Sequence, residues 1–140
     1  MTAILVVDDD PLQRHILNII LSDEGYETHV ASSGEEALRV AKTSEPDVVL
    51  TDICMGDMDG IELMRELKRL RNAPEVIIMS ASGAVLKEEA MGKGAFSYLE
   101  KPLGKYRILL NVKRALASPA KFNKRDPQAL LDSNPRNGQG

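Results

Sequence analysis

Five short apolar segments rich in Val and Ile recur along the chain, and a stretch with helical spacing follows each one. Charges or turn residues bound the segments, and their length is that of buried β-strands. Because they are apolar on both faces, they fit a parallel sheet that helices cover on both sides. The alternation predicts a doubly wound α/β fold whose strands are Ala3–Val7, Thr28–Ala31, Val48–Thr51, Val76–Met79 and Phe96–Leu99.

The stretches between and after these strands carry apolar residues at the spacing of one helix face. Capping residues mark two of the helix starts, since Asp10 precedes Pro11 and Ser33 precedes Glu35. The apolar positions, helix by helix, are Leu12, Ile16, Ile19 and Ile20; Ala37, Leu38 and Ala41; Ile61, Leu63, Met64 and Leu67; Val85, Leu86 and Ala90; and Ile108, Leu109, Val112 and Leu116.

The length of 140 residues and the 43% hydrophobic content are those of one globular domain with a single core. We expect this domain to span residues 1–117. Residues 118–140 hold three prolines and three asparagines with little periodic apolar content, so they are expected to form a flexible tail or linker.

The net charge of -3 gives no overall positive field for nucleic acid or an anionic membrane surface, so neither is expected as a direct partner. The single cysteine, Cys54, excludes an internal disulfide and fits a reducing compartment. No apolar run approaches the roughly 18 residues of a membrane span. A soluble, cytoplasmic protein is therefore expected.

Polar residues stand at the ends of four expected strands: Asp8 and Asp9, Asp52, Ser80, and Lys101. A doubly wound sheet brings such ends to one edge. Two carboxylates about 5 Å apart repel by roughly 3 kcal/mol at an effective dielectric near 20, so a proton or a cation must join them. An oxygen-rich site of this kind suits Mg²⁺, which with a lysine would offset the charge of an incoming phosphoryl group.

Four segments, I-L-V-V-D-D-D-P, V-V-L-T-D-I-C-M-G-D-M-D-G, V-I-I-M-S-A and G-A-F-S-Y-L-E-K-P, resemble the receiver domains of two-component response regulators. The resemblance covers about Ala3 to Ala117. It implies a flavodoxin-like sheet with strand order 2-1-3-4-5. It also implies that Asp52 accepts a phosphoryl group from a histidine kinase or a phosphotransfer protein.

The resemblance also assigns roles around Asp52. Asp9 would bind Mg²⁺ directly and Asp8 partly through water, with Asp52 itself and the backbone carbonyl of Cys54 as further ligands. Lys101 would neutralise the phosphoryl group, and the bond between Lys101 and Pro102 is expected to be cis.

Ser80 and Tyr98 would form a switch in such a domain. Phosphorylation would draw Ser80 toward the site and let Tyr98 turn inward, altering the face formed by the fourth helix, the fifth strand and the fifth helix. A homodimer would use the same face. The segment from Ser82 to Gly94 is about one residue shorter than usual, and Gly92 should weaken the fourth helix.

Three alternatives differ in function class. A Mg²⁺-dependent phosphohydrolase would need an acid two residues beyond Asp52, where Cys54 stands. A pseudo-receiver acting only as an interaction module would have no need of the intact acid, hydroxyl and lysine set. A nucleotide-binding flavodoxin-like protein would need a glycine-rich loop after the first strand. We expect self-phosphorylation and autodephosphorylation but no turnover of external substrates. We also expect that His15 and His29 bind no metal.

Overall fold

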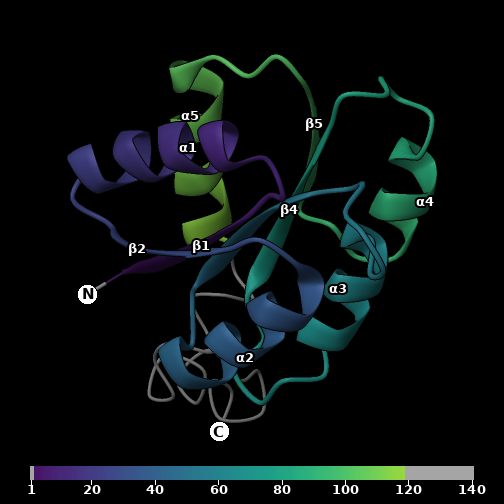
Figure 1. Cartoon of the computed structure of the whole chain (residues 1–140), viewed down its shortest axis with the longest axis horizontal. Coiled ribbons are helices and arrows are strands. Elements are labelled where there is room, and N and C mark those ends of the chain that lie inside the picture. Colours follow the sequence, from purple (N-terminus) through teal and green to yellow (C-terminus); the bar gives the residue numbers. More distant parts are fainter. Residues whose placement is uncertain (1, 119–140) are drawn as a thin grey trace, which may run out of the picture.

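The computed structural model describes residues 2–118, which form one parallel sheet with helices on both faces (Figure 1). The strand order is β2-β1-β3-β4-β5, which confirms the expected fold class and order. The predicted tail, residues 118–140, lies outside the described residues except for Ser118. The strands are β1 (Ala3–Val7), β2 (Glu27–Ala31), β3 (Val48–Asp52), β4 (Glu75–Ser80) and β5 (Ser97–Glu100). The helices are α1 (Pro11–Asp23), α2 (Gly34–Ser44), α3 (Gly60–Leu67), α4 (Lys87–Gly92) and α5 (Lys105–Leu116).

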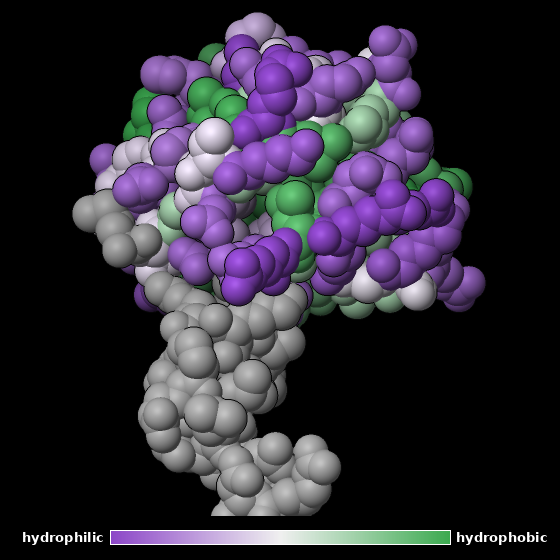
Figure 2. Space-filling model, turned by 90° about the horizontal axis from the view of Figure 1, so that it is seen from below, coloured by the Kyte–Doolittle hydropathy of each residue, from purple (hydrophilic) through white to green (hydrophobic). Residues whose placement is uncertain are grey.

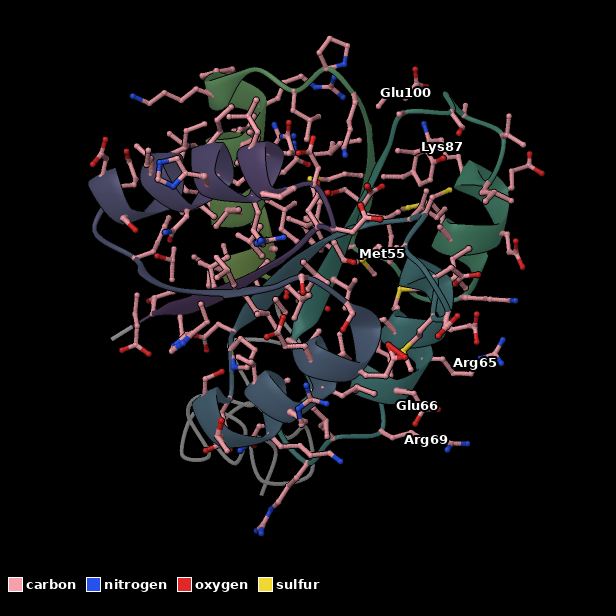
Figure 3. All side chains as sticks on the ribbon, viewed as in Figure 1. Met55, Arg65, Glu66, Arg69, Lys87 and Glu100 are labelled. Atoms are coloured by element: carbon pink, nitrogen blue, oxygen red, sulfur yellow. The ribbon has the colours of Figure 1, made fainter. Side chains whose placement is uncertain are left out.

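The sheet separates two hydrophobic clusters. Helices α1 and α5 cover one face, and α2, α3 and α4 cover the other (Figure 1). The apolar residues predicted for α3 are all buried, while Arg65 of this helix and Arg69, just after it, project away from the sheet (Figure 3). Hydrophilic residues cover most of the lower surface, and hydrophobic residues show there as separate areas (Figure 2). The central strands are therefore buried from both sides, as in other parallel sheets.

The predicted apolar face of α1 is largely wrong, since only Ile20 of its four residues packs against the core. The structure buries Leu17 and Leu21 against the sheet and leaves Leu12, Ile16 and Ile19 exposed. Apolar residues surround most of this helix, so their spacing alone does not select the face that packs. Contact with β1 and β2 selects it instead.

Helix α4 is shorter than its apolar pattern suggested. Val85, expected within it, lies before the helix and is 80% exposed. Leu86 is the residue before the first turn and provides no side-chain hydrogen bond to it. Ala90 is buried as predicted, and Gly92 is the last helical residue rather than an interior one. The predicted caps of α1 and α2 are confirmed, because Asp10 accepts from the Leu12 amide and Ser33 from the Glu36 amide.

Three strands, β3, β4 and β5, extend one residue further than predicted at their carboxyl ends. Asp52 is the last residue of β3 and Ser80 the last of β4, so the sheet itself fixes both backbones. Across the sheet, Asp52 pairs with Met79 and Ser80 with Glu100. No helix within residues 2–118 has the length and apolar character needed to cross a lipid bilayer.

Candidate functional site

Three carboxylates meet where β1 and β3 end. Asp8 follows β1 and is fully buried, Asp9 next to it is exposed, and Asp52 ends β3 with 9% exposure. One carboxylate oxygen from each lies within 4.8 Å of the others. The Asp8 backbone is held by its N–H, which donates to Ala31 O at 3.1 Å. The sequence prediction that these acids converge is borne out by this geometry.

Lys101 joins two of these acids. Its Nζ lies 3.2 Å from Asp8 Oδ2 and 3.2 Å from Asp52 Oδ2. Its backbone N–H donates to Ser80 O at 2.7 Å, and the bond to Pro102 is cis, as expected. Although burial alone would lower it, the carboxylates of Asp52 and Asp8 raise the pKa of the Lys101 ammonium above its usual value. The lysine is therefore a fixed positive charge at the site.

Burial raises the pKa of the Asp52 carboxyl above its ordinary value, and the neighbouring Asp8 adds to this effect. Lys101 opposes it through its charge and hydrogen bond without cancelling it. The site thus holds more negative charge than one ammonium group balances. A further cation would relieve this imbalance.

The carboxylate oxygens are not equally engaged. Asp8 Oδ1 accepts from the Asp10 N–H at 2.9 Å, and Asp52 Oδ1 accepts a longer hydrogen bond from the Cys54 N–H at 3.4 Å. Within residues 2–118, the Asp9 carboxylate has no hydrogen bond or ion pair and faces solvent. These are hard oxygen donors with open positions, so the three acids can hold a metal ion such as Mg²⁺.

Ser80 and Tyr98 hold the loop between β4 and α4. Ser80 is fully buried, and its Oγ accepts from the Ser82 N–H at 3.0 Å. The Tyr98 ring packs in the core with 7% exposure, and its hydroxyl donates to Gly83 O at 2.8 Å. Tyr98 is thus already directed inward in this structure, and its movement on phosphorylation stays a prediction. The ligand role of the Cys54 carbonyl also stays a prediction.

Sequence reasoning missed three residues that shape the site. Gly60 starts α3 so close to β3 that a Cβ there would lie 2.5 Å from Asp52 O. Met55, in the loop after β3, directs its side chain into the molecule (Figure 3), where Thr51 Oγ1 lies 3.9 Å from its sulfur. Arg14 Nη1 donates to Asp8 O at 2.8 Å. Met55 and Gly60 both stand in the segment after the third strand that carries the resemblance, and Gly60 also follows Asp59, whose side chain caps α3.

A small crevice opens beside Asp9, between the start of α2 and the loop after β3. Its volume is about 110 Å³, and it carries acidic and hydroxyl side chains. Of the three clustered acids, Asp9 lines this crevice, and Asp8 and Asp52 do not. The residues that line it are Asp9, Ser32, Ser33, Gly34, Glu35, Met55, Gly56, Asp57 and Met58.

Comparison with known proteins gives a consistent result. A family model described as the response regulator receiver domain matches residues 4–113. Regulatory protein AtoC of Escherichia coli is 41% identical over 120 residues, covering 83% of this chain and 26% of AtoC. Transcriptional regulatory protein KdpE of Mycobacterium tuberculosis is 35% identical over 116 residues, covering 83% of this chain and 51% of KdpE.

A solved response regulator receiver domain protein from Clostridium thermocellum superposes with a TM-score of 0.78 at 32% identity. That match covers 83% of this chain and 94% of the other. The chain spans between about a quarter and half of the length of the curated relatives it matches.

Proposed function

The chain belongs to the response regulator receiver domain family, and we propose that Asp52 is the residue that accepts its phosphoryl group. The observation that carries this proposal is the double contact of Lys101 Nζ with Asp52 and Asp8. It places a fixed cation beside a carboxylate at a solvent-accessible edge of the sheet. A dianionic phosphoryl group could not approach two or three carboxylates without such compensation.

The proposed reaction is displacement at phosphorus. An oxygen of Asp52 attacks the phosphorus of a phosphohistidine on the donor, forming an O–P bond as the P–N bond breaks. The electron pair of the P–N bond returns to the imidazole nitrogen of the donor. Lys101 stabilises the charge on the transferred oxygens, and Ser80 stands at the end of the neighbouring strand as a hydroxyl donor.

Asp8, Asp9 and Asp52, with the Cys54 carbonyl, are the proposed Mg²⁺ ligands. The ion would offset phosphoryl charge when bound. Asp9 supports this assignment, because it is the exposed acid whose oxygens are not otherwise engaged within the described residues. Asp8 and Lys101 would hold the buried side of the site.

The proposed partners follow from this chemistry. The donor would be a histidine kinase or a phosphotransfer protein, acting in the cytoplasm where response regulators work. The output would be a change in the face formed by α4, β5 and α5, which would also serve a homodimer. We propose no turnover of external substrates, since Cys54 stands where a hydrolase of this design would need a leaving-group acid.

Intact mass after incubation with acetyl phosphate and Mg²⁺ tests the proposal. We expect one phosphoryl group on the wild-type chain and none on Asp52→Asn. Chelation of Mg²⁺ should abolish the adduct. Absence of any adduct in the wild type, or an adduct that survives in Asp52→Asn, contradicts the assignment. Steady hydrolysis of a phosphomonoester would favour the hydrolase instead.

A further inference from the structure

We propose that Arg14 positions the metal-binding acids by holding the peptide group between Asp8 and Asp9. Arg14 lies on α1, and its Nη1 reaches back to donate to Asp8 O at 2.8 Å. That carbonyl belongs to the planar peptide that links the two acids, so its orientation sets where both side chains leave the backbone. The inference rests on the proposed Mg²⁺ site.

Glu36 of α2 lies near enough to Arg14 for the guanidinium charge to act on its carboxyl, but no ion pair joins the two side chains among residues 2–118. Hydrogen bonds from Ser32 lower the pKa of the Glu36 carboxyl, and the charges of Arg39 and Arg14 lower it further. Glu36 Oε1 accepts from the Ser32 N–H at 2.6 Å and from its hydroxyl at 3.1 Å. Arg14 is therefore held by its hydrogen bond to Asp8 O, and its charge also acts on Glu36 in the first turn of α2.

The charge of Arg14 alone would work against a nearby Mg²⁺. Its hydrogen bond goes to the Asp8 carbonyl, while Asp8 Oδ1 and Oδ2 bond to the Asp10 N–H and to Lys101. The two possible roles of Arg14, through charge and through positioning, therefore predict opposite changes in Mg²⁺ affinity. If Arg14 acted only through charge, its removal would tighten Mg²⁺ binding; if it positions the acids, its removal weakens Mg²⁺ binding.

Calorimetric titration of the full chain with Mg²⁺ separates these roles. We expect Arg14→Met to weaken Mg²⁺ binding by roughly 10-fold, the lower end of the effect seen when an outer-shell partner of a metal ligand is removed. Arg39→Met is the matched control, because Arg39 also acts on Glu36 through its charge and makes no contact with Asp8. It should leave the affinity unchanged or tighten it. Arg14→Lys should recover part of the loss.

At saturating Mg²⁺, the phosphorylation rate of Arg14→Met should fall by a smaller factor than its Mg²⁺ affinity. The reason is that a bound ion would itself hold the acids in place. An unchanged or tighter Mg²⁺ affinity in Arg14→Met overturns the proposal. If that variant does not fold by circular dichroism, Arg14→Gln decides, with a loss of Mg²⁺ affinity expected and an unchanged or tighter affinity contradicting the proposal. A wild-type chain that binds no Mg²⁺ contradicts the proposed metal site itself.

Discussion

At the scale of single residues, Asp52 carries a charge that its surroundings only partly balance. Burial and Asp8 raise its carboxyl pKa, and Lys101 opposes them. A raised pKa means that the folded chain holds this proton more tightly than the unfolded chain does. The protonated Asp52 carboxyl therefore contributes to stability at low pH, and this contribution is lost as the pH rises through the pKa that the carboxyl has in the folded chain. The ionised carboxylate is the form that would attack phosphorus, and ionising it lowers the free energy of unfolding.

The pKa of Asp52 can be measured directly. In metal-free protein, the ¹³C shift of the Asp52 carboxyl should titrate with a midpoint above the ordinary value of 3.8. Lys101→Met should move this midpoint higher, because Lys101 is the group that lowers it. A midpoint at or below 3.8 in the wild type, or a lower one in the variant, would contradict this picture of the site.

Gly60 controls how closely α3 approaches Asp52. Because a Cβ at Gly60 would lie 2.5 Å from Asp52 O, Gly60→Ala must displace backbone. We expect a loss of about 1–3 kcal/mol in the free energy of unfolding, measured in urea. Gly92→Ala is the control: no heavy atom lies within 4 Å of its Cβ, so no loss should follow. Equal effects of the two changes would show that the close approach is not the cause.

At the scale of secondary-structure elements, the order of strands and helices was predictable and two details were not. Alternating apolar segments and the caps Asp10 and Ser33 marked the elements, and the polar residues at strand ends located the site. The buried face of α1 depends on tertiary contact, because that helix is apolar on several sides. The start of α4 lacks a capping side chain and so leaves no mark in the sequence. Arg14 was missed because its partner is a backbone carbonyl.

The loop between β4 and α4 depends on one side-chain hydrogen bond from β5. Tyr98→Phe removes the donor to Gly83 O and should cost about 0.5–1.5 kcal/mol of stability. Amide hydrogen exchange should quicken mainly in residues 82–86. Tyr106→Phe is the matched control, since Tyr106 is 75% exposed. Unchanged exchange in Tyr98→Phe would show that the loop is held by other contacts.

At the scale of the whole molecule, the acids at the strand ends link metal binding to folding. An ion that binds only the folded chain stabilises it by about 1.4 kcal/mol when its concentration is ten times Kd. Mg²⁺ should raise the melting temperature by this mechanism, and chelation should reverse the rise. The gain should be smaller in Asp9→Asn. An equal gain in that variant would place the bound ion elsewhere.

The central claim is that the phosphoryl group forms an acyl phosphate on Asp52. Borohydride reduction after phosphorylation converts an aspartyl phosphate to homoserine, which peptide mass spectrometry locates in the chain. We predict homoserine at position 52, dependent on both Mg²⁺ and the phosphoryl donor. Homoserine at any other aspartate, or a phosphorylated chain with none, would contradict the account.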